Sequence, residues 1–213
     1  MEDKIVIIGG GGHAKVIINV LKKLNSYNIL GYTDLKEKGL ILGIKYLGTD
    51  EVLKKVIKAE KSCNAVIAIG NIKISEVRQK IYEKINKLHF IFPVIISPNA
   101  IVNENVEIGE GSVVLDGAII NTSAQIGKFA IVNTNAVIEH DSHSGDFIHF
   151  AAGSILGGGA TIGDNSLLGV GAKIIQYKNV GENCLIGAGS VVIKDIKLEG
   201  TYFGVPARKI SIS

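Results

Sequence analysis

This chain of 213 residues has only two cysteines, a small net charge and few long apolar runs. The two cysteines, Cys63 and Cys184, lie far apart and suggest neither a disulfide framework nor a metal pair, which fits a reducing cytoplasm. The net charge of +3 is too small and too dispersed to favour nucleic acid. The apolar run at residues 5–8 ends at once in glycines, so it predicts neither a signal peptide nor a membrane span.

What the chain does have is a strict repeat between residues 96 and 198. Every sixth residue there is aliphatic or aromatic, and Ser144 is the one exception. The position two residues earlier is usually small, and the position just after is often glycine. The repeated large residues are Val102, Ile108, Val114, Ile120, Ile126, Val132, Ile138, Phe150, Leu156, Ile162, Leu168, Ile174, Val180, Ile186, Val192 and Leu198.

A six-residue period fits neither a helix nor a simple alternating strand, and it is typical of a parallel β-helix built of hexapeptides. Each hexapeptide would form one short strand and one corner, with its large residue stacked inward on the next coil. We expect the glycine after each large residue to adopt unusual backbone angles. Coils would lie about 4.8 Å apart and depend on one another for stability.

The first ninety or so residues alternate between strand and helix patterns, which predicts a small parallel α/β domain. Composition agrees with a globular protein, since 46% of the residues are hydrophobic and 20% charged. We therefore divide the chain into an α/β domain at 1–94 and a β-helix at 95–213. Strands are expected at 4–8, 29–33, 65–69 and 90–96, and helices at 14–24, 50–59 (capped by Asp50) and 75–87.

A glycine-rich turn follows the first strand. Gly9, Gly11 and Ala14 fit the G-x-G-x-x-G/A pattern that places phosphates at a helix N-terminus. Asp34 ends the second strand, where a carboxylate would meet a ribose hydroxyl. The motif favours a nucleotide-bearing ligand, and a tight strand-to-helix turn is the alternative. The small number of strands argues against a full dinucleotide.

Polar residues gather around Ser144, where the repeat is broken. Three of the five histidines lie there, and His140 is followed directly by Asp141. An imidazole is well suited to take up protons at neutral pH, and a neighbouring carboxylate can fix its tautomer. We interpret His140 as a general base, against the alternative of a surface histidine. His140, His143 and His149 also admit a zinc site of the kind found in trimeric β-helical carbonic anhydrases.

Together these features resemble bacterial sugar acetyltransferases. The features are the glycine-rich α/β domain, the hexapeptide repeat, the Glu139-His140-Asp141 segment and the final Gly204-Val205-Pro206-Ala207-Arg208. The nearest resemblance is to N-acetyltransferases that modify nucleotide-linked 4-amino-4,6-dideoxy sugars, with sialic acid O-acetyltransferases as close relatives. The resemblance covers nearly the whole chain.

The resemblance implies a left-handed β-helix, three of which pack side by side in a cytoplasmic homotrimer. Acetyl-CoA would lie in the groove between two subunits, and no metal would be needed. By position, His140 resembles the catalytic base and Asp141 its partner, where relatives can carry glutamate. The coenzyme contacts would be His149, Val170 and Ala188, and the nucleotide-sugar site would comprise Gly11, Gly12, His13, Thr33 and Asp34.

Three functions follow as hypotheses. The favoured one is transfer of an acetyl group from acetyl-CoA to the amine of a nucleotide-linked sugar. The second is O-acetylation of sialic acid or another sugar hydroxyl. The third, from a different class, is a zinc-dependent hydratase or a scaffold without catalysis.

Overall fold

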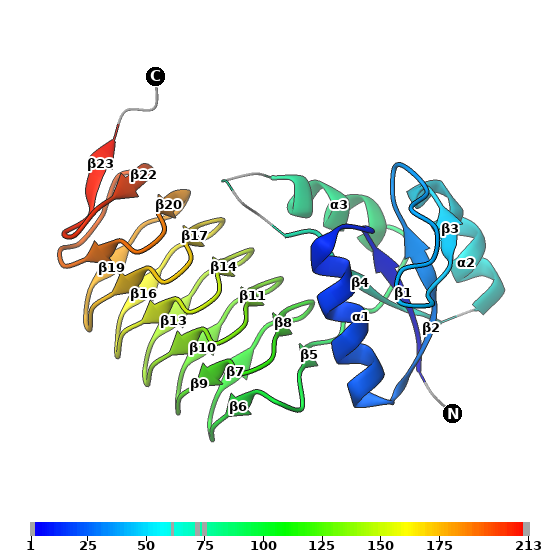
Figure 1. The fold of residues 1–213 in the computed structure, drawn as a ribbon, viewed down its shortest axis with the longest axis horizontal. Helices are drawn as coiled ribbons and strands as arrows, with labels where there is room; N and C mark the ends of the chain where they lie inside the picture. Colours follow the sequence, from blue (N-terminus) through cyan, green and yellow to red (C-terminus); the bar gives the residue numbers. More distant parts are fainter. Residues whose placement is uncertain (1–2, 61, 71–72, 74–75, 211–213) are drawn as a thin grey trace. The chain divides into compact units, whose positions relative to one another are not determined.

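The structure is a computed structural model that describes residues 3–60, 62–70, 73 and 76–210. It contains two compact units, one formed by residues up to 70 together with 76–98, and the other formed by residues from 99 onward. The first is an α/β unit and the second is a β-helix (Figure 1). The fold class predicted from the sequence is confirmed.

The first unit is built on a four-stranded parallel sheet in the order β3-β2-β1-β4. Its central strand β1 is completely buried over Ile5–Ile8. That burial on both faces explains why the segment shows as an unbroken apolar run in the sequence. The strands are β1 (Asp3–Ile8), β2 (Tyr27–Thr33), β3 (Tyr46–Gly48) and β4 (Asn64–Ile67). The short strand β3 was not predicted.

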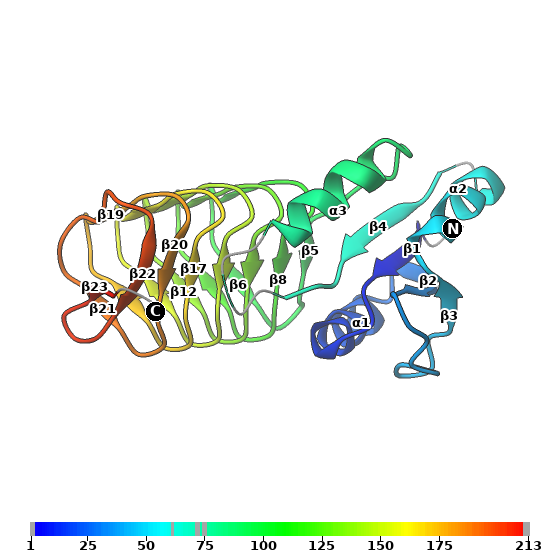
Figure 2. The ribbon, with the colours of Figure 1, turned by 90° about the horizontal axis from the view of Figure 1, so that it is seen from above.

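Helices cover both faces of this sheet, with α1 on one side and α2 and α3 on the other (Figure 2). The helices are α1 (Gly12–Leu24), the 3-10 helix η1 (Asp50–Val52), α2 (Leu53–Glu60) and α3 (Val77–Asn86). Asp50 does not cap the second helix as predicted, because it is the first residue of η1 and Thr49 takes the cap position. Among the described residues, no helix has the length and apolar content needed to cross a membrane.

Two local predictions in this unit were wrong. The apolar spacing at 14–24 predicts that Val16 faces the core, but it is 39% exposed on α1, whereas Ile18 is fully buried. The expected strand at 90–96 is reduced to β5 (Ile95–Ile96), preceded by an isolated bridge between Ile91 and Asn64. The predicted helix at 75–87 begins, in the described residues, at Val77, and Ser75 itself lies outside them.

The second unit is a left-handed parallel β-helix whose short strands form three sheets. Each strand pairs with the strand 18 residues later, so three hexapeptides make one coil. The large repeated residues point inward, as Val114, Val132, Phe150 and Leu168 do in one buried stack. This arrangement confirms the period of the repeat.

The strands of the β-helix are β6 (Ile101–Val102), β7 (Glu107–Ile108), β8 (Val113–Val114), β9 (Ile119–Ile120), β10 (Gln125–Ile126), β11 (Ile131–Val132), β12 (Val137–Ile138), β13 (His143–Ser144), β14 (His149–Phe150), β15 (Ile155–Leu156), β16 (Thr161–Ile162), β17 (Leu167–Leu168), β18 (Lys173–Ile174), β19 (Asn179–Val180), β20 (Cys184–Ile186), β21 (Val191–Val192), β22 (Gly200–Phe203) and β23 (Arg208–Ile210).

The glycines after the large residues do not adopt the unusual angles we expected. Left-handed backbone instead occurs three residues after each large residue, at Asn105, Asp141, Tyr177 and their equivalents. Glycine is required at the predicted positions because the next coil passes close by. A Cβ on Gly163, for example, would lie 2.6 Å from the backbone nitrogen of Glu182.

The repeat also ends earlier than predicted. Ile196, not Leu198, takes the last inward position and bridges to Val180, which shortens this coil from 18 residues to 16. Leu198 is 67% exposed as a result. The segment after the repeat is structured over 200–210, where β22 continues the sheet of β20 and β23 pairs antiparallel with β22.

Replacing Gly163 by alanine should lower the free energy of unfolding by about 2 kcal/mol, because one of two backbones must shift to admit the methyl group. Gly153→Ala is the matched control, since Gly153 has a φ of +67° and open space around it. That control should cost about 1 kcal/mol for the left-handed backbone alone. Urea unfolding measures both, and a Gly163→Ala variant as stable as wild type would contradict the explanation from coil spacing.

Candidate functional site

The glycine turn between β1 and α1 leaves the helix N-terminus open. A Cβ on Gly10 would lie 2.7 Å from the Tyr32 ring, whereas Gly11 and Gly12 have no atom within 4 Å of that position. No side chain caps α1 at Gly11. Backbone N–H groups at a helix start attract anions, so this turn can receive a phosphate.

Asp34 binds the turn itself. Its Oδ2 accepts a hydrogen bond from the Gly10 N–H at 2.8 Å and an ion pair from Lys38 Nζ at 3.0 Å, while Oδ1 accepts from the Lys36 N–H at 3.3 Å. Burial acts to raise the pKa of Asp34, but these bonds from Lys38, Gly10 and Lys36 outweigh it, and the net shift is downward. The carboxylate that the sequence predicts to meet a ribose therefore holds the glycine turn in place.

A pocket of about 520 Å³ opens beside this turn. It combines the glycine backbone with two cations, Lys15 and Lys38, and with an apolar segment at 40–42. Cations and open N–H groups suit a diphosphate, and the apolar segment suits a flat base. Sequence reasoning missed Lys15, Lys38 and residues 40–42; the spacing of Lys38 four residues after Asp34 was the one available signal.

Thr33 and His13, the other two residues predicted for the nucleotide-sugar site, do not line this pocket. Thr33 is completely buried, and its hydroxyl donates to Asp50 Oδ1 at 2.7 Å. Its carbonyl accepts from the Gly9 N–H at 2.8 Å, so Thr33 shapes the turn through its backbone. His13 is half-buried at the start of α1, beside Gly70. The structure does not bring the Thr33 hydroxyl to the pocket.

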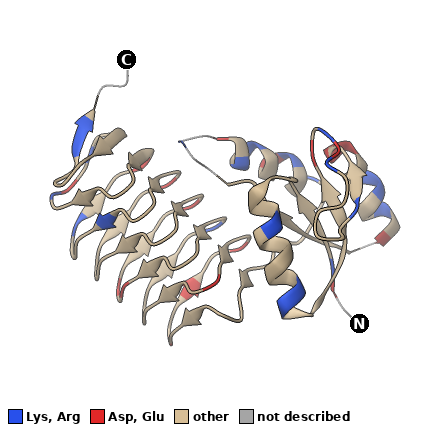
Figure 3. Ribbon diagram, in the orientation of Figure 1, with Lys and Arg blue, Asp and Glu red and all other residues tan. Residues whose placement is uncertain are grey.

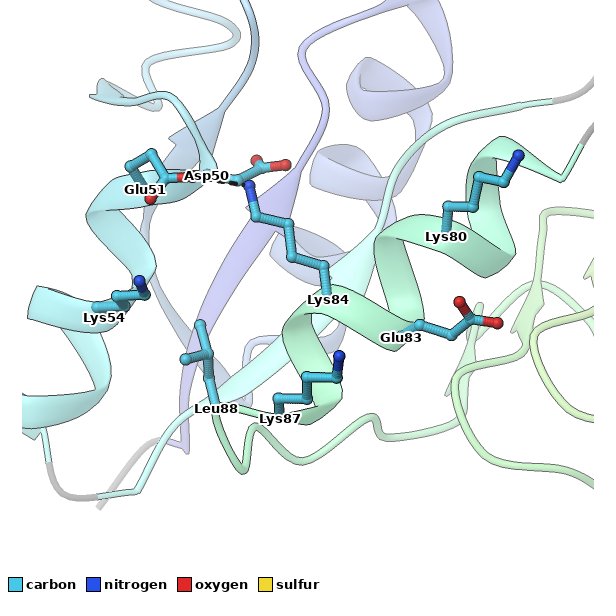
Figure 4. A pocket seen from close by; sticks show the side chains of 8 residues that line it. All are labelled: Asp50, Glu51, Lys54, Lys80, Glu83, Lys84, Lys87 and Leu88. Atoms are coloured by element: carbon cyan, nitrogen blue, oxygen red, sulfur yellow. Dashed lines mark hydrogen bonds and ion pairs between the residues drawn. The ribbon is translucent and has the colours of Figure 1, made fainter.

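A second hollow of about 400 Å³ lies between η1, α2 and α3 (Figure 4). Lysines from two helices face it together with acidic residues, and Lys84 forms an ion pair with Glu51 at 3.0 Å. That mixture of signs gives it little net attraction for an anion, and none of the predicted site residues lines it. The glycine turn is therefore the better candidate in this unit.

In the β-helix, His140 and Asp141 form the predicted pair. His140 Nδ1 lies 2.8 Å from Asp141 Oδ2, and both side chains are more than half exposed. A carboxylate only accepts hydrogen bonds, so Nδ1 carries the proton and Nε2 presents a lone pair. Asp141 reaches the ring because it occupies the left-handed corner position, with a φ of 56°.

The histidine pair belongs to one edge of the β-helix, which we call the histidine edge. It comprises residues 104–105, 122–123, 140–141, 158–159 and 176–177, joined from coil to coil by backbone hydrogen bonds such as Gly159 N–H to His140 O at 2.9 Å. A Cβ on Gly158 would lie 2.7 Å from His140 Nε2. Glycine at 158 therefore makes room for the imidazole, which lies directly over this residue.

A ladder of polar side chains leads to the histidine from the N-terminal coils. Asn103 Nδ2 donates to Asn121 Oδ1 at 2.8 Å, and Asn121 Nδ2 donates to Glu139 Oε2 at 2.9 Å. These residues recur every 18 positions, which is the signal that could have found them. They provide hydrogen-bonding groups of the kind that bind sugar hydroxyls.

The predicted coenzyme contacts lie elsewhere on the same chain. Val170 and Ala188 are exposed on successive coils of a different edge, between β17 and β18 and between β20 and β21, which we call the valine edge. His149, on β14, is only 8% exposed and lies 3.3 Å from Asn133 Nδ2 through its Nε2. One chain thus does not unite His140 with these residues.

Ser144, the break in the repeat, stands in the inward stack between Ile126 and Ile162. Its hydroxyl accepts from the Gly127 N–H at 3.3 Å, and it borders a shallow hollow of about 330 Å³ along β7, β10 and β13. Within the described part of the chain, no three His, Cys, Asp or Glu side chains are grouped as a metal site would require.

These features are those of a hexapeptide-repeat acyltransferase that carries an α/β unit before its β-helix. Residues 4–85 match the family described as "PglD N-terminal domain". UDP-N-acetylbacillosamine N-acetyltransferase of Bacillus subtilis (strain 168) is 34% identical over 112 residues, which cover 52% of this chain and 50% of that protein. The matched region thus spans about half the length of this curated relative.

Two solved structures match almost end to end. GDP-perosamine N-acetyltransferase from Caulobacter crescentus, a histidine-to-alanine mutant in complex with CoA and GDP-perosamine, is 35% identical with a TM-score of 0.91, covering 98% of this chain and 97% of its own. The acetyltransferase domain of PglB from Neisseria gonorrhoeae is 33% identical with a TM-score of 0.91, covering 98% and 100%. The chain belongs to the family of nucleotide-sugar N-acetyltransferases.

Replacing Asp34 by asparagine should lower the stability of the protein by about 1 kcal/mol at pH 7, because the ion pair with Lys38 and part of the bond to Gly10 are lost. The folded pKa of Asp34 lies below its unfolded value of 3.8, so its contribution is complete above that value and disappears as pH falls through the folded pKa. Unfolding curves from pH 7 to 2 test this. A difference between variant and wild type that stays constant to pH 2 would contradict it.

Proposed function

We propose that this protein transfers an acetyl group from acetyl-CoA to the amine of a nucleotide-linked 4-amino-4,6-dideoxy sugar. The observation that carries the proposal is the bond from His140 Nδ1 to Asp141 Oδ2, which leaves the Nε2 lone pair available beside Gly158 on an exposed edge. The relatives support the choice of substrate, since the Caulobacter enzyme is solved with CoA and GDP-perosamine and the Neisseria domain with acetyl coenzyme A.

His140 Nε2 would take a proton from the sugar amine as the amine attacks the thioester carbonyl. The bond from nitrogen to carbon forms, and the carbon–sulfur bond then breaks to release CoA thiolate. The proton held by His140 passes to that thiolate. Asp141 holds the ring in the required tautomer and stabilises the imidazolium, and such general base catalysis contributes about 10²–10⁴-fold.

The tetrahedral intermediate carries an oxyanion that needs a donor. The amide of Gly157 donates to Ile174 O and that of Gly159 to His140 O, whereas no bond from the Gly158 amide is seen within the described residues. Gly158 lies directly beneath Nε2. We assign its N–H as the oxyanion donor, a role that is often the largest single contribution in acyl transfer.

The site requires a second copy of the chain. His140 lies on the histidine edge, and Val170 and Ala188 lie on the valine edge. A coenzyme that reaches both groups fits a groove between the histidine edge of one chain and the valine edge of its neighbour. Three-fold packing of the β-helices, in a cytoplasmic homotrimer, closes such a ring of grooves.

The two units divide the substrates between them in this proposal. The α/β unit, residues 1–94 in the division from sequence, holds the nucleotide at Gly11, Gly12 and Asp34, with His13 and the Thr33 backbone shaping the turn. The β-helix, residues 95–213, holds acetyl-CoA. The bases of relatives differ, as UDP and GDP sugars both occur, and the apolar segment at 40–42 carries no group that selects between them.

The acceptor can be tested directly with acetyl-CoA, nucleotide-linked amino sugars, the matching nucleotide 4-hydroxy sugars and sialic acid. Thiol release is expected only with the amino sugars, because a neutral amine attacks a thioester far better than a hydroxyl. Thiol release with sialic acid and not with any amino sugar would overturn the assignment in favour of O-acetylation. Unchanged rates after treatment with a metal chelator are expected as well.

Replacing His140 by alanine should reduce kcat by about 10²–10⁴-fold and leave KM for both substrates nearly unchanged. His143→Ala is the matched control, because His143 is an exposed histidine three residues away on β13. Steady-state kinetics of both variants measure the effect. Wild-type turnover by His140→Ala, or an equal loss in the control, would show that His140 is not the base.

A further inference from the structure

Tyr177 is an aromatic residue in a backbone conformation that bulky side chains rarely adopt. Its φ is 56°, and its side chain is 68% exposed. The equivalent corner positions on the histidine edge hold Asn105, Ser123, Asp141 and Gly159. Glycine and small polar residues are what this conformation favours, so a tyrosine here calls for an explanation.

Packing explains the comparable aromatic residues but not this one. Phe129 and Phe147 also have left-handed backbone, and their rings stack in parallel with centroids 5.1 Å apart. Phe129 is 1% exposed, so its strain is offset by burial. Tyr177 gains little burial, and strain retained without packing is typical of functional positions.

The ring of Tyr177 lies close to the proposed catalytic centre. A Cβ on Gly159 would lie 2.6 Å from Tyr177 Cδ1, while a Cβ on Gly158 would lie 2.7 Å from His140 Nε2. The Cα atoms of neighbouring residues are about 3.8 Å apart. The imidazole therefore lies against Gly158 and the phenol ring against the adjacent Gly159, one from the preceding coil and one from the following coil.

The two sides of His140 differ in chemistry. The polar ladder of Asn103, Asn121 and Glu139 approaches from the N-terminal coils. The C-terminal side holds the amide of Gly158 and the ring of Tyr177, and the sequence around Tyr177 carries Lys173 and Lys178. An acceptor sugar rich in hydroxyls fits the ladder, and the less polar end of a thioester fits the tyrosine.

Charge along the β-helix changes in the same direction (Figure 3). Residues 99–172 hold eight acidic side chains and a single cation, Lys128. The described residues from 173 onward hold three acidic side chains and six basic ones, which are Lys173, Lys178, Lys194, Lys197, Arg208 and Lys209. The phosphates of CoA are attracted to the basic end, which places the donor on the Tyr177 side of the histidine.

We infer that Tyr177 is a donor-binding residue, whose ring packs against the pantetheine arm of acetyl-CoA next to the thioester. The inference rests on the proposed function, since it assumes that acetyl-CoA is the donor. It accounts for an exposed aromatic ring at a strained corner, against Gly159, which follows the glycine under His140, and on the basic side of the centre. Tyr177 touches the donor and takes no part in proton transfer.

Tyr177→Asn and Tyr177→Gly test this, because both residues suit a left-handed corner. Each variant should be at least as stable as wild type in thermal unfolding and yet show a KM for acetyl-CoA raised by about tenfold, the scale of one lost aromatic contact. KM for the nucleotide sugar should stay within twofold. Tyr177→Phe should keep most of the affinity, since the ring and not the hydroxyl makes the contact.

Asn105→Gly is the matched control, with the same backbone conformation on the same edge but two coils before His140. It should change neither KM. A rise in KM for the sugar alone in the Tyr177 variants, or no rise in either KM, would overturn the inference. So would a change in the size of the assembly by light scattering, because Tyr177 would then be a subunit contact.

Calorimetric titration with CoA separates this inference from the proposed function. If wild-type protein binds CoA and the Tyr177→Asn variant binds it about tenfold more weakly, Tyr177 keeps its role even where no amino sugar is acetylated. If wild type does not bind CoA at all, the proposed function fails, and the inference fails with it. Equal CoA affinity in both proteins overturns the inference alone.

Discussion

The stacking of one coil on the next, 18 residues apart, is the constraint on which the rest of this structure depends. Backbone hydrogen bonds and inward aliphatic stacks repeat in the same register from the first coils to Val192. Positions equivalent in this register lie one above another along an edge. Residues distant in sequence, such as Asn103, Asn121 and Glu139, are brought together by that register alone.

The same constraint explains which predictions from sequence succeeded. The period of six identified the β-helix and its inward residues, because burial of a stack leaves a repeated apolar position. The role of the glycines could not be read in this way. Gly163 and its equivalents are small because the neighbouring backbone is close, and a close approach between coils leaves no local signal in the sequence.

The limits of prediction in the first unit and at the chain end have similar physical causes. Thr33 and Asp34 are adjacent in the sequence, but the alternation of a strand turns the Thr33 hydroxyl inward to Asp50 and Asp34 toward the glycine turn. Lys38 and residues 40–42 come from an irregular loop that no period identifies. The spacing of the sequence placed the last inward residue at Leu198. The last coil is shortened, so that the inward position falls at Ile196, two residues earlier.

The histidine site shows how a regular scaffold carries chemistry at its corners. His140 and Asp141 could be paired from sequence because they are neighbours, and the left-handed corner is what turns the carboxylate onto Nδ1. Their relation to Val170 and Ala188 is different, since these residues occupy another edge of the same chain. The geometry of a single chain therefore accounts for the pairing of the proposed base with its partner, and the proposed donor groove needs the assembly of chains.

The central claim is that the reaction takes place at His140 Nε2, in a groove completed by a neighbouring chain. A crystal structure of the protein with CoA and a nucleotide-linked 4-amino sugar tests it most directly. Our account places the sugar amine within about 3 Å of His140 Nε2, with the thiol of CoA on the side of Gly158 and against two chains. An amine bound far from this nitrogen, or CoA held by one chain without His140 nearby, would contradict it.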